Sequence, residues 1–552
     1  MKRPSSSPLR FYIISATLIV LISLIVFTAY QPTLDNGFLD WEDRDYIINN
    51  PHIKALTWQN VQAFFSFYQG NWTPLTWFSH ALTYALFGLE PWGHHGVNVL
   101  LHCLNTLCLW FLALQVITLV SVPHSTTPYQ TVFTATLIAL WFGLHPQHVE
   151  AVAWVSARKD VLSLFFILST FICYLLFHQK QEYLGYMFAL GCFCLALLAK
   201  PIAMTVPFLL LLLDIYPLQR FVSTENKICQ YRTIFLEKVP FFLLGGLSFL
   251  LTVSAQYQGE AVTDLSVFGI NERLLNATHS IILYLSKLLF PIFLSPMYPL
   301  SKEISVFPMV ATFLITGICI YTAYKKHIYA LIAWLFYLIT LLPVLGFIQI
   351  GGHAAADRFT YLSTLPFYFL IGGGIIKMVY SSKWFLKSTL LMVSLGISVG
   401  LFSLTRQQTF IWKNDLILWS YAALYAPNNS LIQSNLGHSY LAQGYYKEAL
   451  QHYQLALTQT DQQMYYDVGA IYYNAAVATF KLGRYQEALS ILEKMAMCDR
   501  LTNPPREMIY YQMALIYAQS GSLTQARDML NQALVVNPQY QAAKDLLVRL
   551  HL

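Results

Sequence analysis

Apolar residues run in blocks from Phe11 to Leu404, after which a polar pattern rich in alanine, tyrosine and glutamine takes over. A helix needs roughly 20 apolar residues to cross the hydrocarbon core of a bilayer. The blocks therefore predict membrane spans, and each is expected to be helical because lipid leaves unpaired backbone groups unsatisfied. Twelve candidate spans follow from the pattern: 11–30, 97–119, 131–145, 161–178, 185–199, 202–216, 239–255, 276–294, 306–324, 328–348, 361–379 and 386–404.

The change of pattern divides the chain into two predicted domains. Residues 1–404 form a polytopic membrane domain whose first extracytoplasmic loop is 31–96, and residues 405–552 form a soluble helical domain. The predicted fold class is all-α. The first span is too long for the apolar core of a cleavable signal, and the basic residues before it hold the N-terminus in the cytoplasm: Lys2, Arg3 and Arg10.

Basic loops decide the predicted orientation. Lys and Arg gather in 217–238, at Lys325–Lys326 and in the stretch 377–387, which should all be cytoplasmic. They share one side only if the number of crossings is odd, which favours eleven over twelve and places the C-terminal domain outside the cytoplasm. The sequence does not show which candidate fails to cross, although the short pair split by Lys200-Pro201 has the weakest claim. The net charge of +6 is explained by this anchoring and does not suggest nucleic acid as a partner.

An internal repeat marks the C-terminal domain. Gly444–Ala449, Gly483–Ala488 and Gly521–Ala526 share one pattern, and each follows a helix rich in tyrosine and alanine. Small residues at these places allow two antiparallel helices to pack closely, and neighbouring pairs bury the faces that one pair leaves open. The pattern resembles tetratricopeptide repeats and predicts an α-solenoid. Its ligand cannot be read from the sequence.

Four acids stand within six positions just after the first span, in a chain of which 11% is charged. Apolar neighbours hold this segment against the bilayer and raise the basicity of a carboxylate by desolvation. Glu42 and Asp43 are therefore the candidate catalytic pair, with a solvated turn as the ordinary alternative. The segment reads Phe38-Leu-Asp-Trp-Glu-Asp-Arg-Asp-Tyr46.

A second group lies between the spans 131–145 and 161–178. His145, His148 and Glu150 could bind a divalent metal, but Pro146 prevents a helical pairing of the two histidines, and orienting hydrogen bonds are favoured. No cofactor or metal is assigned. Both Arg158 and Lys159 suit a lipid phosphate, since the arginine provides several N–H donors in one plane and the lysine a compact positive charge. Basic residues on the extracytoplasmic side call for an anion, since positive anchoring belongs on the cytoplasmic side.

Three further ionisable residues stand at the ends of spans. Asp357 and Arg358 precede the span 361–379, and Lys200 precedes 202–216. Ionisable residues at membrane depth are functional candidates by default, although pairing between helices is a simpler role.

Motifs in order along the chain carry a resemblance to a known family. They are Trp41-Glu-Asp43, Asn50-Pro-His52, Asn71-Trp-Thr-Pro-Leu-Thr-Trp77, His94-His-Gly-Val-Asn98, His145-Pro-Gln-His-Val-Glu150, Arg158-Lys-Asp160, Lys200-Pro201, Leu213-Asp214 and Asp357-Arg-Phe-Thr-Tyr361. Together with the repeats, they resemble bacterial tetratricopeptide-bearing membrane glycosyltransferases of the GT-C type. The eukaryotic relatives of this group are the transmembrane and tetratricopeptide-containing O-mannosyltransferases.

The resemblance implies an enzyme that takes a sugar from a polyprenyl-phosphate donor on the extracytoplasmic face. In the eukaryotic relatives the sugar is mannose, the acceptor is a protein Ser or Thr, and a first-loop carboxylate is the base. That role passes to Asp43 or Glu42, with Asp43 preferred because most relatives have Asp where this chain has Glu42. Arg158, Lys159 and Arg358 are expected to neutralise the departing phosphate. The implied location is the bacterial inner membrane, with the repeats outside the cytoplasm holding an acceptor protein or glycan.

Three other interpretations remain open at this stage. The same core suits a transferase that builds glycolipid or cell-surface polysaccharide. A scaffold is less suitable because so many apolar segments with paired charges exceed what an anchor needs. A transporter would place ionisable residues in mid-span, whereas here they concentrate at span ends.

Overall fold

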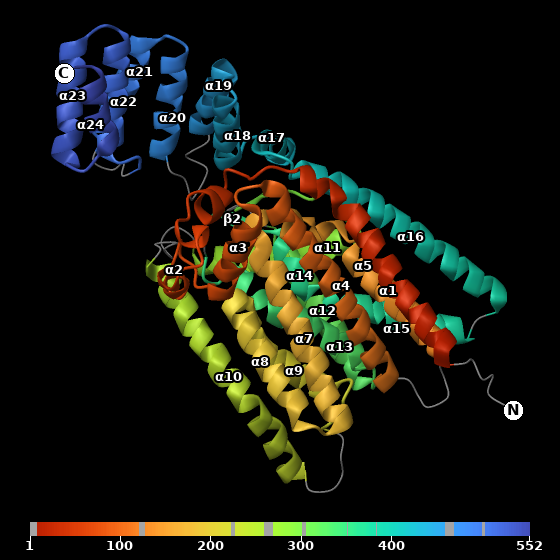
Figure 1. Ribbon diagram of the computed structural model, residues 1–552. Coiled ribbons are helices and arrows are strands. Elements are labelled where there is room, and N and C mark those ends of the chain that lie inside the picture. Colours follow the sequence, from red (N-terminus) through yellow and green to blue (C-terminus); the bar gives the residue numbers. More distant parts are fainter. Residues whose placement is uncertain are drawn as a thin grey trace, which may run out of the picture. The chain divides into compact units, whose positions relative to one another are not determined.

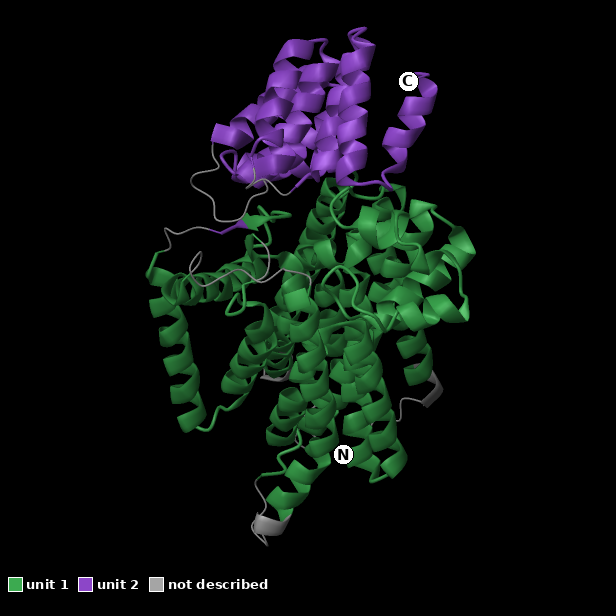
Figure 2. Cartoon of the chain, turned by 90° about the vertical axis from the view of Figure 1, so that its left-hand side faces the viewer, with its two compact units in different colours: residues 1–298, 302–414 green, residues 299–301, 415–552 purple. Residues whose placement is uncertain are grey.

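The computed structural model consists almost entirely of helices, as the all-α prediction requires, and its contacts separate two compact units (Figure 2). The first unit contains residues 1–298 and 302–414, and the second contains 299–301 and 415–552. The only strands within the described ranges are β1 (Tyr298–Pro299) and β2 (His353–Ala355), which pair with each other. The ranges that the structure describes are 8–120, 127–221, 227–258, 269–300, 305–349, 352–381, 383–458, 468–498 and 503–551.

Every candidate span overlaps a helix of the first unit (Figure 1). These helices are α1 (Pro8–Tyr30), α4 (Pro91–Val120), α5 (Pro128–Gly143), α7 (Arg158–Lys180), α8 (Tyr183–Ala199), α9 (Val206–Ile215), α10 (Lys227–Gln258), α11 (Ile270–Leu289), α12 (Phe307–Tyr324), α13 (Tyr329–Leu341), α15 (Leu365–Ser381) and α16 (Trp384–Ile411). The last of them runs past residue 404, and the contacts divide the units between Asn414 and Asp415.

Length and composition qualify six of the described helices as membrane spans, or seven if the bent pair Asp357–Ser363 and Leu365–Met378 is counted as one. Three shorter apolar helices accompany them: Tyr183–Ala199, Pro201–Ile215 and Tyr329–Val344. Large apolar side chains point outward on several helices, as lipid contact requires; Leu243 is 70% exposed and Phe313 is 69% exposed. The first unit is therefore that of a multi-pass membrane protein.

Short helical elements between the long helices contain or adjoin most of the predicted site residues, whereas Arg158 and Lys159 begin α7 itself. The first loop contains η1 (Gln31–Asp35), η2 (Arg44–Ile48), η3 (His52–Lys54), α2 (Trp58–Ala63) and α3 (Pro74–Phe87). The second contains η4 (Pro146–His148), α6 (Val149–Ala153) and η5 (Val155–Ala157), and Trp154 between the last two has an extended backbone. Residue 200 precedes η6 (Pro201–Thr205), and residues 357–363 form η8 (Asp357–Phe359) and α14 (Thr360–Ser363). All of these elements lie outside the twelve helices above.

The second unit is a series of antiparallel helix pairs, as predicted for tetratricopeptide repeats. The turns within three pairs pass through Gly444, Gly483 and Gly521, whose φ angles are +84°, +78° and +83°. Only glycine adopts this left-handed conformation without strain, which explains why the glycine repeats. The helices are α17 (Asp415–Tyr425), α18 (Ser430–Ala442), α19 (Tyr446–Thr458), α20 (Val468–Lys481), α21 (Tyr485–Ala496), α22 (Arg506–Gln519), α23 (Leu523–Val536) and α24 (Gln541–Arg549).

Candidate active site

Asp43 is enclosed by the protein and joins the first loop to the second. Its side chain is fully buried. Oδ1 accepts hydrogen bonds from the backbone N–H of Ser156, at 2.9 Å, and from the Ser156 hydroxyl, while Oδ2 accepts one from the N–H of Leu39 at 3.0 Å. Burial raises the pKa of Asp43 to about 7, and the bonds from Leu39 and Ser156 oppose this rise. The carboxylate thus holds the acidic segment against the turn that precedes α7.

Glu42 has a different environment from its neighbour. Its side chain is 32% exposed, and Oε2 lies 3.6 Å from Nζ of Lys159. The same ammonium lies 5.1 Å from the centre of the Tyr46 ring. Of the two predicted acids, Glu42 is therefore the one that a substrate can approach in this conformation, so the geometry does not support the preference for Asp43 as the base.

Charged residues from three further segments line one small pocket. Lys200 forms an ion pair with Asp160, which follows Lys159 in α7. Arg358 forms an ion pair with Glu150, and its backbone N–H also donates to Glu150 at 3.0 Å. Asp160, Lys200 and Arg358 line this space, which we call the charged pocket, together with the apolar side chains of Phe359, Tyr361, Leu362, Ile202, Ile167 and Leu164, and with Ser163.

A stack of tryptophans joins the first loop to the charged pocket. The rings of Trp41 and Trp154 lie 4.8 Å apart and nearly parallel, and Trp412 continues the stack at 6.0 Å from Trp154. The guanidinium carbon of Arg358 lies 5.2 Å from the centre of the Trp154 ring and 5.0 Å from that of Phe359. Trp41 directly precedes Glu42, so the segment that carries this acid and the Arg358 guanidinium both contact the Trp154 ring.

Arg158 is a fully buried cation, and each of its three side-chain nitrogens donates a hydrogen bond within the protein. Its Nε donates to Asn98, its Nη1 to Ser79 and Thr83 at 3.1 and 3.0 Å, and its Nη2 to the carbonyl of His94 at 2.8 Å. These partners belong to α3 and α4, so Arg158 ties both helices to the start of α7. This geometry supports a positioning role for Arg158 in place of the expected contact with phosphate.

The remaining predicted residues form hydrogen bonds that hold the second loop and the segment 357–363 in place. His148 is bonded to the carbonyl of Phe142 at 2.8 Å and to the Thr364 hydroxyl at 3.3 Å, and His145 to the carbonyl of Leu288 at 3.1 Å. Asp357 accepts a hydrogen bond from the Tyr298 hydroxyl at 3.1 Å. In the described parts of the chain, no three His, Cys, Asp or Glu side chains lie close enough to hold a metal ion.

Sequence reasoning missed two members of the site. Asp160 was visible as the third residue of Arg158-Lys-Asp160, and its pairing with Lys200 over 40 positions required the fold. Ser156 gave no signal, because a single serine beside an apolar run suggests no partner. The structure shows that it supplies two of the three hydrogen bonds to Asp43.

Comparison with known proteins supports the relation indicated by the motifs. "Protein O-mannosyl-transferase F38B6.6" of Caenorhabditis elegans is 25% identical over 458 residues, which are 79% of this chain and 61% of that protein. "Protein O-mannosyl-transferase TMTC1" of Homo sapiens is 24% identical over 70% of this chain and 48% of its own length. "Protein O-mannosyl-transferase TMTC2" of Mus musculus is 39% identical over 106 residues, which are 19% of this chain and 11% of that protein. The chain thus spans about half to three fifths of the length of the first two proteins.

Family models locate the repeats independently. Residues 432–465 and 509–540 each match the tetratricopeptide repeat. A solved structure, the APC/C hetero-tetramer Cut9–Hcn1, aligns with 87% of this chain and 90% of that chain at 14% identity, but its TM-score of 0.24 supports no conclusion. The chain is therefore a multi-pass membrane relative of protein O-mannosyl-transferases that carries tetratricopeptide repeats.

Proposed function

We propose that this protein transfers mannose from a polyprenyl-phosphate donor to the hydroxyl group of a protein Ser or Thr on the extracytoplasmic face. The observation that carries the proposal is the meeting of one accessible acid with three cations from separate segments. Glu42 lies beside Lys159, and Lys200 and Arg358 line the charged pocket. Glu42 acts electrostatically on Arg358, and Lys159 acts on Lys200, so the two pairs share one environment. The names of the relatives supply the sugar and the class of acceptor.

In the proposed reaction, Glu42 accepts the proton of the acceptor hydroxyl. The hydroxyl oxygen forms a bond to the anomeric carbon, and the bond from that carbon to the phosphate oxygen breaks, so that polyprenyl phosphate leaves with the electron pair. A phosphate leaving group needs no proton, and one carboxylate is therefore sufficient. Asp43 acts as a positioning residue, because its bonds to Ser156 and Leu39 fix the backbone from which Glu42 projects.

The cations stabilise the charge that develops on the phosphate. Lys159, Lys200 and Arg358 have side chains that are 14%, 11% and 10% exposed, so a bound phosphate would meet them away from bulk water. Electrostatic interactions are much stronger in such surroundings than in solution. Asp160 and Glu150 hold two of these cations in place before the donor binds, and the Trp154 ring supports Arg358 from one side.

The proposed setting is the bacterial inner membrane, with the N-terminus in the cytoplasm and the repeats outside it. The acidic first-loop segment, the start of α7 with Lys159, and the segments that carry Lys200 and Arg358 would then share the extracytoplasmic side. Lipid on the outer faces of the helices would hold the polyprenyl chain, and the repeats would hold an acceptor protein.

The test is transfer of radiolabelled mannose from synthetic polyprenyl-phosphate mannose by the full-length protein in vesicles. We expect Glu42→Gln to lose at least about 100-fold in rate, the lower range for removal of a general base. Asp45→Asn, an exposed acid three positions away, should keep the wild-type rate. Label found in extracted glycolipid rather than in protein would overturn the acceptor assignment. Full activity of Glu42→Gln would overturn its role.

A further inference from the structure

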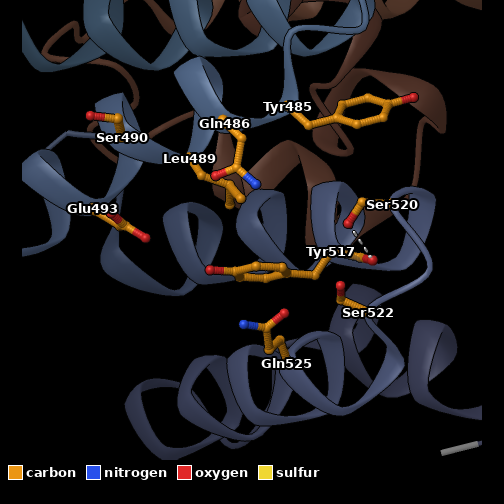
Figure 3. Close-up of a pocket in the computed structure, with 9 residues that line it drawn as sticks. All are labelled: Tyr485, Gln486, Leu489, Ser490, Glu493, Tyr517, Ser520, Ser522 and Gln525. Atoms are coloured by element: carbon orange, nitrogen blue, oxygen red, sulfur yellow. Dashed lines mark hydrogen bonds between the residues drawn. The ribbon is translucent and has the colours of Figure 1, made fainter.

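A polar groove lies in the second unit between the last two repeat pairs, and none of its lining residues takes part in the proposed reaction. Its walls come from α21, from the end of α22, from the turn that follows and from the first residues of α23 (Figure 3). Its volume is about 250 Å³. Pockets for drug-sized ligands have volumes of roughly 300–1,000 Å³, so this groove suits a smaller ligand or one unit of a longer ligand.

The lining of the groove has an unusual chemical character. It consists of two tyrosines, two glutamines, one glutamate, three serines and a single aliphatic residue, Leu489. Glutamine amides and serine hydroxyls each donate and accept hydrogen bonds. No lysine or arginine is among the lining residues, which argues against phosphate or acidic peptides as ligands.

Tyr517 is the centre of this arrangement. In Figure 3 its ring lies between the side chains of Gln486 and Gln525, and its hydroxyl end is directed toward Glu493. The Tyr517 side chain is half-buried, whereas Gln486, Gln525 and Glu493 are exposed. The groove therefore combines a half-buried aromatic ring with exposed, adaptable hydrogen-bonding groups.

We propose that this groove binds a saccharide. A hexose has an apolar face of C–H groups that packs on an aromatic ring, and a rim of hydroxyls that each donate and accept hydrogen bonds. Tyr517 matches the face, and Gln486, Gln525 and Glu493 match the rim. Addition of a peptide strand requires an unpaired strand edge, and helical or proline-rich peptides require apolar side-chain pockets, for which this lining offers only Leu489.

The identity of the sugar rests on the proposed function. If the membrane unit attaches mannose to proteins, the natural ligand of the groove is a mannosylated segment, and the repeats would retain a protein that has already been modified. Retention of this kind would favour several transfers to one acceptor, because a second site held close to the first has a high effective concentration.

The binding test uses the full-length protein in a detergent without a sugar head group and follows saturation transfer to methyl α-mannoside by NMR. All variants are made in the Glu42→Gln protein, so that binding is measured without the transfer reaction. We expect binding in the millimolar range and a loss of about threefold to tenfold for Gln525→Ala, the effect of one or two hydrogen bonds. Gln486→Ala with Gln525→Ala should remove the signal, and both residues are exposed, so the fold is retained.

The matched control is Tyr445→Ala, which removes an exposed tyrosine in the first helix pair, while Tyr517→Ala removes the ring at the centre of the groove. Loss of signal in the groove variants with retention in Tyr445→Ala supports the proposal. An unchanged signal in the double variant, no saturable signal, or equal binding of an unmodified Ser/Thr peptide would overturn it. If a glucoside or galactoside bound in place of the mannoside, the groove would still be a saccharide site, but mannose would not be its ligand. That result would count against the proposed function alone.

Discussion

The buried carboxylate of Asp43 should make the stability of the protein depend on pH in a defined direction. The unfolded chain loses the Asp43 proton near its ordinary pKa of 3.8, whereas the folded protein keeps it to about 7. Between these values the folded state binds more protons than the unfolded state, so the free energy of unfolding falls as pH rises. The difference is about 4 kcal/mol at and above neutral pH, from about 1.4 kcal/mol for each pH unit.

Asp43→Asn removes this proton and should therefore flatten this part of the stability curve. At low pH the variant should be less stable than the wild type by about 1–3 kcal/mol, because the asparagine NH₂ group faces the N–H of Leu39 and leaves it without an acceptor. As pH rises toward 8, the two curves should converge or cross.

Unfolding of the full-length protein in detergent, followed by intrinsic fluorescence from about pH 4.5 to 8, measures the effect over the range that the two pKa values define. Asp45→Asn is the control, since Asp45 is exposed in the same segment, and its curve should parallel the wild type. A difference between the wild type and Asp43→Asn that does not change with pH would refute the reasoning. It would mean that Asp43 titrates in the folded protein as it does in the unfolded chain.

Two further predictions concern the pocket and the repeats. Lys200→Met leaves the carboxylate of Asp160 buried without its partner and should lower the free energy of unfolding by about 3–5 kcal/mol. Adding Asp160→Asn should restore much of that loss. Thermal unfolding in detergent measures both variants, and equal stability of the single and double variants would contradict the pairing. Gly483→Ala should destabilise the second unit by about 1–2 kcal/mol because the φ of Gly483 is left-handed. Gly396→Ala, inside α16 and with open space around it, should be neutral or stabilise by up to about 1 kcal/mol. Equal losses of stability in the two variants, measured by limited proteolysis, would argue against the repeat turn.

The sequence was sufficient to predict the all-α class and the repeats, for reasons that particular residues make clear. An apolar block long enough to cross a membrane predicts a helix without knowledge of the residues it packs against. In the repeats, Gly444, Gly483 and Gly521 mark turns that need a left-handed backbone. The number of crossings was harder to predict, because helices such as Tyr183–Ala199 and Tyr329–Val344 are apolar but short.

The site was only partly predictable because its contacts join distant segments. Glu42, Lys159, Lys200 and Arg358 were each identifiable as rare charges at span ends, yet their partners were not. The roles of Asp43 and Arg158 depend on burial: both have their polar atoms occupied by Ser156, Leu39, Asn98 and other internal groups. A pattern of charges shows where ions are placed along the chain, but the fold decides which of them face a substrate.

The central claim is that Lys159, Lys200 and Arg358 bind the phosphate of a polyprenyl-linked sugar, and photoaffinity labelling tests it most directly. A polyprenyl phosphate with a diazirine in its first prenyl unit would be cross-linked to the full-length protein in vesicles and mapped by mass spectrometry. We predict label in the lining segments around Asp160–Leu164, Lys200–Ile202 and Arg358–Leu362, competed by unlabelled donor and reduced in Arg358→Met. Label confined to other helices, or unchanged in Arg358→Met, would contradict the account.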